Sequence, residues 1–137
     1  MLRVVVDTNI FISGLLKSSN NRQLIILLQN SKFTLLISPE TLDELISVIS
    51  RPKFHKVINR IDAEALIEII KTHAVLVNPL QKFDIIKDDI NDNRFLELAF
   101  EAKADLIVSG DHHLLLLKTF HGIPIITSKE FIIQVSA

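Results

Sequence analysis

Short apolar runs alternate with longer amphipathic segments along most of the chain. The runs are rich in β-branched residues and show no polar alternation, which is typical of strands buried on both faces of a sheet. The longer segments repeat their apolar residues at helical spacing. We predict strands at residues 2–6, 33–37, 74–77, 105–108 and 123–126, and helices at 22–29, 39–49, 62–72, 92–103, 112–118 and 129–134.

The alternation of strands and helices predicts an α/β fold with a mostly parallel central sheet of about five strands and helices on both faces. Local signals support the ends of the second predicted helix: Ser38 before Pro39 suits its start, and Arg51 before Pro52 suits its end. No repeat, low-complexity tract or linker-like stretch interrupts the chain. We therefore expect one domain covering residues 1–137.

The composition limits the cellular compartment in which the protein is expected and the kinds of chemistry that its side chains can carry out. No apolar run approaches the roughly 20 residues needed to cross a bilayer, and the first residues lack the apolar core of a signal peptide, so we expect a cytoplasmic protein without a membrane span. The absence of cysteine excludes disulfides, thiolate metal ligands and a cysteine nucleophile. A net charge of −1, from 15 Lys and Arg against 16 Asp and Glu, argues against a module held to nucleic acid by a strong positive field.

Several acidic residues are expected at one edge of the sheet. Asp7 and Asp111 follow the first and fourth predicted strands, and the carboxyl ends of parallel strands form the edge where α/β proteins bind ligands. Asp92 lies on the apolar stripe in the first turn of its helix, where a carboxylate needs a partner. In the second predicted helix, spacing favours Glu44 over Asp43 only weakly as a further member.

Each of these acids has an ordinary structural explanation when it is taken alone. Asp92 or Asp111 at a helix start suits an N-cap, and Asp7 suits a turn that closes a strand. Glu44 alone suits a solvated helix face. Their convergence favours a site, because carboxylates gathered at one edge repel one another unless cations neutralise them. Oxygen ligands suit Mg²⁺ or Mn²⁺, and two such ions can activate a water and clamp a phosphodiester.

Four blocks occur in order and at domain-scale spacing: VVVDTN at 4–9, SPETLDEL at 38–45, DINDNRFL at 89–96 and VSGDHHLL at 108–115. Together they resemble the PIN-domain nucleases, most closely the branch that contains toxin components of toxin–antitoxin systems. The likeness extends over nearly the whole chain. It implies a metal-dependent endoribonuclease that binds Mg²⁺ or Mn²⁺ and hydrolyses RNA phosphodiester bonds with a metal-activated water.

The resemblance also assigns roles to individual residues. The acidic quartet that would bind metal and carry catalysis is matched by Asp7, Glu44, Asp92 and Asp111. Positions that would support these acids or a bound water are matched by Asn9, Ser109 and Asp89. The chain departs from the branch at Ile90, where a proline often stands, and at His113, where a further aspartate often stands. Neither departure removes a member of the quartet.

A basic segment without acidic residues follows the second predicted helix. Its charged members are Arg51, Lys53, Lys56 and Arg60. Such a run suits a solvated face, and beside an acidic metal site it also suits a surface that positions an RNA backbone without reading its sequence. We treat these four residues as candidate substrate-binding residues.

Two other functions stay open at this point. One is a catalytically silent PIN fold that binds RNA or serves assembly. The other is a metal-dependent phosphatase of the haloacid-dehalogenase type, although that chemistry uses a second aspartate where Asn9 stands.

The resemblance further implies a small antitoxin that covers the acidic groove, and a homodimer. A mean hydropathy of +0.36 suits an apolar face buried between subunits.

Overall fold

The computed structural model describes residues 1–16, 19–87 and 89–136. Within these ranges, the strands are β1 (Arg3–Val6), β2 (Thr34–Ile37), β3 (Ala74–Leu76), β4 (Leu106–Val108), β5 (Thr119–Phe120) and β6 (Ile123–Ile126). They form one sheet in the order β3-β2-β1-β4-β6-β5. All pairs are parallel except β5 with β6. The predicted α/β class and mostly parallel sheet are confirmed, and β5 adds a short antiparallel edge.

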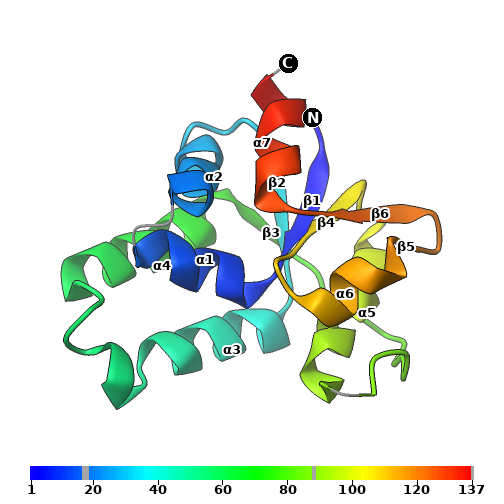
Figure 1. Ribbon diagram of the computed structural model, residues 1–137, viewed down its shortest axis with the longest axis horizontal. Coiled ribbons are helices and arrows are strands. Elements are labelled where there is room, and N and C mark those ends of the chain that lie inside the picture. Colours follow the sequence, from blue (N-terminus) through cyan, green and yellow to red (C-terminus); the bar gives the residue numbers. More distant parts are fainter. Residues whose placement is uncertain (17–18, 88, 137) are drawn as a thin grey trace.

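Helices lie on both faces of this sheet, as Figure 1 shows. They are α1 (Thr8–Leu15), α2 (Ser19–Gln29), α3 (Pro39–Ile49), α4 (Arg60–His73), α5 (Asn93–Ala102), α6 (His112–Leu117) and α7 (Ser128–Ser136), with short 3₁₀ helices η1 (Pro52–Phe54) and η2 (Ile90–Asp92). Buried residues of α1, α2, α4 and α7 pack against one face, and those of α5 and α6 pack against the other. The sequence pattern predicts each α-helix except α1.

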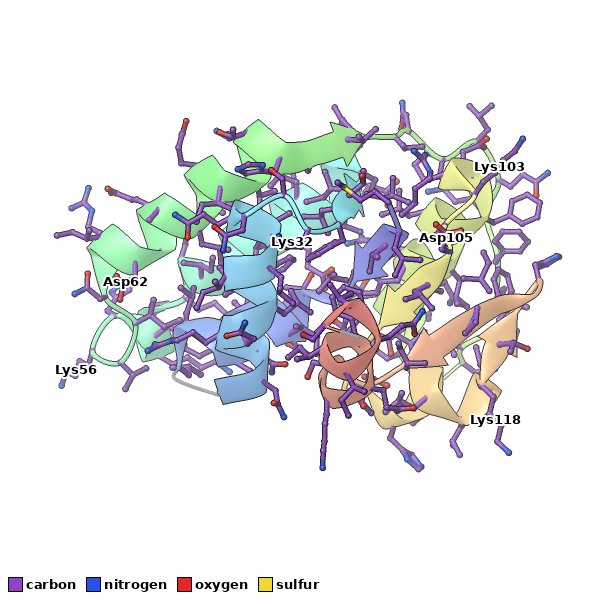
Figure 2. All side chains as sticks on the ribbon, turned by 90° about the horizontal axis from the view of Figure 1, so that it is seen from above. Lys32, Lys56, Asp62, Lys103, Asp105 and Lys118 are labelled. Carbon is purple, nitrogen blue, oxygen red and sulfur yellow. The ribbon has the colours of Figure 1, made fainter. Side chains whose placement is uncertain are left out.

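Many charged side chains are exposed, whereas Asp7, Asp92 and Glu97 are buried. Figure 2 labels six charged residues that are exposed: Lys32, Lys56, Asp62, Lys103, Asp105 and Lys118. No helix in the described ranges is both long enough and apolar enough to cross a membrane.

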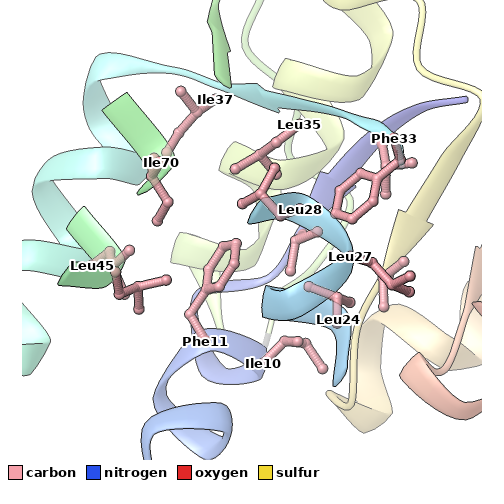
Figure 3. Packing of buried hydrophobic residues seen from close by; sticks show 14 of the residues in the cluster. Ile10, Phe11, Leu24, Leu27, Leu28, Phe33, Leu35, Ile37, Leu45 and Ile70 are labelled. Atoms are coloured by element: carbon pink, nitrogen blue, oxygen red, sulfur yellow. The ribbon is translucent and has the colours of Figure 1, made fainter. Parts of the chain in front are cut away.

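The strand β1 divides its side chains between two apolar cores. Val4 and Val6 belong to the core that also holds Phe11 and Leu28, whereas Val5 belongs to the opposite core with Phe95. Figure 3 shows the first of these cores, where α1 and α2 pack on the sheet. A register shift of one residue would carry Arg3 or Asp7 into a position that a buried valine occupies, which disfavours such a shift. The sheet therefore holds the residue that follows β1 in a defined position.

The helix α3 begins as the sequence predicts. The Ser38 hydroxyl accepts a hydrogen bond from the Thr41 backbone at 3.1 Å, and the Thr41 hydroxyl accepts one from the Ser38 backbone at 2.9 Å. Pro39 occupies the first turn, which suits its fixed φ. At the other end, Arg51 is extended ahead of Pro52, so the helix stops at Ile49. These signals set which residues of α3 face the carboxyl edge of the sheet.

Candidate functional site

The ends of β1 and β4 bring two acidic residues together. Val6 pairs with Val108, and the backbone N–H of Asp7 donates to the Val108 carbonyl at 2.9 Å. The buried Ser109 hydroxyl then donates to Asp7 Oδ2 at 2.8 Å and accepts from the Asp111 backbone at 2.9 Å. Because β1 lies between β2 and β4, this contact stands where the strand order changes direction, which is where open α/β sheets bind ligands.

Asp7 is held at both carboxylate oxygens. Its side chain is only 2% exposed, Oδ2 accepts from Ser109, and Oδ1 accepts the backbone N–H of Asn9 at 3.1 Å. This second bond also caps helix α1. The Asn9 side chain itself is exposed, so Asn9 supports Asp7 through its backbone amide.

A carboxylate cluster completes this edge of the sheet. One side-chain oxygen from each of Asp89, Asp92 and Asp111 lies within 4.8 Å of the other two. Asp92 is 5% exposed, and its buried Oδ2 has no hydrogen-bond partner among the described residues. A buried carboxylate oxygen without a donor, facing two like charges, is the arrangement that a divalent cation would satisfy. The residues present therefore fit a hard metal ion.

The N-cap explanation holds for one of these acids and not for the other. Asp111 Oδ1 accepts backbone N–H groups of His113 at 2.7 Å and Leu114 at 3.4 Å, and so caps α6. Asp92 makes no side-chain bond to the start of α5. Asp89 caps the short helix η2 through the backbone of Asn91 at 3.1 Å while taking part in the cluster. The position of Asp92 is thus not explained by capping.

The fourth member of the matched quartet is Glu44 on α3. Its Oε2 accepts a hydrogen bond from the buried Thr8 hydroxyl at 3.3 Å, whereas the neighbouring Asp43 is exposed. Burial raises the pKa of Glu44, and the positive charge of Arg94 opposes this rise. The structure therefore identifies Glu44, and not Asp43, as the acid of α3 that belongs to the candidate site; helical spacing favoured Glu44 only weakly. Thr8 was not among the predicted residues, although it stands between Asp7 and Asn9 in the first block.

Burial dominates the electrostatics of the cluster. Loss of solvent raises the pKa of Asp7 to about 6, with hydrogen bonds from Ser109 and Asn9 acting against the rise and the charge of Asp111 adding to it. Burial likewise raises the pKa of Asp92, and the charges of Asp111 and Asp89 raise it further. Without a cation, the fold therefore disfavours the ionised form of both acids.

These shifts predict a pH dependence for the metal-free protein. The folded pKa of Asp7 is about 6 against an ordinary 3.8, so the folded state holds this proton to higher pH than the unfolded state does. The associated stability, on the order of 3 kcal/mol, is fully present below about pH 4 and is lost as the pH rises through about 6. We expect Tm in EDTA to be lower at pH 8 than at pH 5.5, measured by differential scanning fluorimetry. A Tm that rises over this interval would contradict the shift.

A buried amide ties the segment that carries Asp89 to helix α5. Asn93, which is 2% exposed, accepts backbone N–H groups of Ile85 at 3.0 Å and Ile86 at 2.9 Å. Its amide nitrogen donates to the carbonyls of Ile86 at 3.0 Å and Ile90 at 3.1 Å. One side chain therefore satisfies four backbone groups just ahead of Asp92. No sequence signal beyond its place next to Asp92 pointed to Asn93.

The basic segment is not a uniform surface. All four predicted side chains are exposed: Arg51, Lys53, Lys56 and Arg60. Arg60 pairs with Glu64 at 3.0 Å and lines a cavity of about 780 Å³ between α3, η1 and α4, which the site acids do not reach. Arg51 is the member whose charge acts on Glu44, where it opposes the effect of burial on the pKa. The structure thus connects this segment to the acidic site at its first residue.

Comparisons with known proteins agree with this geometry. A family described as PIN domain matches residues 3–113. The chain is 31% identical over 121 residues to the uncharacterized protein MJ1680 of Methanocaldococcus jannaschii, which covers 85% of this chain and 76% of that protein. The crystal structure of PAE2754 from Pyrobaculum aerophilum matches 98% of this chain and 90% of its own with a TM-score of 0.62; at 13% identity this likeness shows the fold alone. The chain therefore belongs to the PIN domain family.

Proposed function

We propose that this protein is an endoribonuclease that uses Mg²⁺ or Mn²⁺ to hydrolyse RNA phosphodiester bonds. PIN domains are typically metal-dependent nucleases, and the chain belongs to that family. The observation that carries the proposal is the cluster of Asp89, Asp92 and Asp111 within 4.8 Å, together with the buried oxygen of Asp92 that lacks a donor. Such a set of hard oxygens suits these two cations better than zinc.

The metal would be held by Asp7, Glu44, Asp92 and Asp111, with Asp89 at the exposed margin of the cluster. When bound, it would supply charge neutralisation, Lewis acidity toward the phosphodiester and a lowered pKa for the attacking water. The chain itself supplies orientation. Ser109 and the Asn9 backbone fix Asp7, and the Thr8 hydroxyl holds Glu44. Such supporting bonds keep acidic ligands in one arrangement before the substrate arrives.

Removal of the metal tests this proposal directly. Purified protein is expected to cleave single-stranded or structured RNA with Mn²⁺ or Mg²⁺, to lose cleavage in EDTA and to regain it when the metal is returned in excess. Asp7→Asn should lower the cleavage rate by at least about 1,000-fold, because it removes one anionic ligand of the proposed metal site. Asp43→Asn, an exposed change of the same charge one residue before Glu44, should leave the rate within about twofold.

The other functions predict different outcomes in the same assay. Cleavage by Asp7→Asn at the wild-type rate would show a contaminating nuclease or a wrong site. Phosphate release from small phosphomonoesters with the RNA intact would indicate a phosphatase. RNA binding that EDTA does not alter, without cleavage, would indicate a PIN fold that serves only binding or assembly.

We further propose that the enzyme is the toxin of a toxin–antitoxin pair, acts in the cytoplasm and forms a homodimer. The proposal rests on the likeness of the four sequence blocks to that branch, and on exposed apolar side chains such as Ile61 at 74% and Leu80 at 84% that a second subunit would cover. A small antitoxin would cover the acidic cluster. Co-purification with the product of a neighbouring short gene, and the mass by light scattering, test these partners; a monomer alone at micromolar concentration would contradict the dimer.

A further inference from the structure

A chain of charged side chains borders the acidic cluster where α3 and α5 meet. Glu40 Oε2 lies 3.3 Å from Arg94 Nε, and Glu40 Oε1 lies 2.9 Å from Lys82 Nζ. Lys82 also lies 3.6 Å from Glu97, a buried carboxylate whose other oxygen accepts the backbone N–H of Phe83 at 2.9 Å. Arg94 and Lys82 therefore share the carboxylate of Glu40. Lys82 is also paired with the buried Glu97.

These cations stand beside the site acids. Arg94 is two residues after Asp92, and Glu40 is one helical turn before Glu44 on α3. After burial, the charge of Arg94 is the largest influence on the pKa of Glu44. The network is built from α3, α5 and the stretch after β3, and it borders the acidic cluster through Arg94.

Both cations keep donors that their partners do not use. The Lys82 side chain is 67% exposed and that of Arg94 is 37% exposed. Glu40 faces the Nε of Arg94. The two terminal amino groups of Arg94 make no hydrogen bond to any of the described residues. A guanidinium held at Nε presents those amino groups as a fork, which matches the oxygens of a phosphate. An exposed ion pair adds little stability by itself, so stability alone does not account for the arrangement.

An RNA substrate needs such donors next to a site made of carboxylates. Metal ions would neutralise the acids and the phosphate that is cleaved, whereas the neighbouring phosphates of the strand stay charged. Cations beside the site would hold those phosphates and set the register of the strand without reading its sequence. The sequence points to the basic segment 51–60 for this task, but its member Arg60 is bound to Glu64 and lines a separate cavity.

We propose that Arg94 and Lys82, oriented by Glu40, bind the phosphate that neighbours the scissile one in the RNA backbone. The proposal rests on the proposed nuclease function for its substrate class. Arg94 and Lys82 are substrate-binding residues in this view, and Glu40 is a positioning residue.

Salt-dependent RNA binding tests the proposal without requiring cleavage. Binding of a fluorescently labelled oligouridine is measured by anisotropy with Mg²⁺ at several salt concentrations, in the Asp7→Asn background so that the RNA stays intact. Arg94→Gln and Lys82→Gln should each weaken binding about three- to tenfold, and each should reduce the slope of log affinity against log salt by about 0.7, the value for one phosphate contact on a single strand. Arg94→Lys should keep the slope and recover part of the affinity.

Lys32→Gln is the matched control, because it removes one exposed positive charge just ahead of β2, at the amino edge of the sheet, whereas the site acids lie at the carboxyl edge. It should change neither affinity nor slope. In the cleaving protein, Arg94→Gln should raise KM with little change in kcat, as the loss of a uniform binding contact does.

The outcomes separate this inference from the proposed function. An unchanged slope in Arg94→Gln and Lys82→Gln, with or without a lower Tm, would show that the network is structural and would overturn the inference even if the wild type cleaves RNA. Failure of the Asp7→Asn protein to bind the RNA would also overturn it. A reduced slope in the two variants, together with a wild type that does not cleave RNA in Mn²⁺ or Mg²⁺, would support the inference and contradict the proposed nuclease.

Discussion

Asp92→Asn is expected to abolish RNA cleavage while making the metal-free protein more stable. Asp92 is buried, its Oδ2 has no donor, and Asp89 and Asp111 face it with like charges. Asparagine keeps the shape, removes the repelling charge and brings an N–H that can donate to Asp111. We expect a gain of about 1–2 kcal/mol in EDTA at pH 8, roughly 3–10 °C in Tm, and a fall in the cleavage rate of at least about 1,000-fold.

The metal should reverse the order of stability. Mn²⁺ that binds only the folded state should stabilise the wild type by mass action. The site is weakened in Asp92→Asn, so Mn²⁺ should raise the Tm of the wild type more than that of the variant. Asp43→Asn serves as the control, because the same substitution at an exposed position of α3 should move neither Tm nor the cleavage rate. A lower Tm for Asp92→Asn in EDTA would show that the cluster is satisfied without a cation.

Asn93→Ala is expected to have the largest effect on folding stability among single substitutions near the site. Its side chain makes four hydrogen bonds to backbone groups of Ile85, Ile86 and Ile90. Alanine leaves those groups without a partner, and an unsatisfied buried group costs about 1–3 kcal/mol. With relaxation of the segment toward solvent, we expect a loss of about 3 kcal/mol in the free energy of unfolding, measured by urea titration in EDTA.

The same substitution should impair cleavage even where the protein is folded. The tether lies directly ahead of Asp92 and holds the segment that leads to Asp89, so its loss loosens two members of the cluster together. We expect an increased requirement for Mn²⁺ in the cleavage assay at a temperature well below Tm. Asn30→Ala, at an exposed position after α2, is the matched control and should leave both properties unchanged. A stable Asn93→Ala with full activity at low metal concentration would exclude the tether.

The parts of the fold that follow from local pattern were predictable from the sequence. The run of valines in β1 predicts a strand buried on both faces. In the structure, Val5 lies in one core and Val4 and Val6 lie in the other. The start of α3 follows from Ser38 and Pro39, whose effects act within one helical turn. Because parallel strands align their carboxyl ends, the same reasoning anticipated that Asp7 and Asp111 would lie at one edge.

Elements that depend on packing were not predictable in this way. Helix α1 consists largely of apolar and β-branched residues, which lack a helical period and do not favour helix on their own. It forms because Asp7 caps it and because Gly14 lets α2 come close: a Cβ there would lie 3.1 Å from the Asn21 carbonyl oxygen. The strand β5 has two residues, and its hairpin turn places both His121 and Gly122 at positive φ.

The same holds for the site. Residues that follow a strand or begin a helix were found from their position, whereas Thr8 and Arg94 act through contacts with α3, which is far away in the chain. Asn93 bonds to the irregular backbone at Ile85, Ile86 and Ile90, whose path has no periodic signal in the sequence. Glu44 and Asp43 lie at similar angular distances from the apolar face of their helix, so spacing favours Glu44 only weakly. The Thr8 hydroxyl of α1, an element that the pattern did not predict, is what distinguishes them in the structure.

The hydrogen bond between Ser109 and Asp7 has a consequence for the order of events during synthesis. Its two residues are 102 positions apart, and Asp7 leaves the ribosome early in translation. The central strand cannot receive β4, and Asp7 cannot meet Ser109 and Asp111, until most of the chain has emerged. A nascent or truncated chain that ends before these residues therefore has no complete acidic centre, and the acids of the proposed metal site come together only near the end of synthesis.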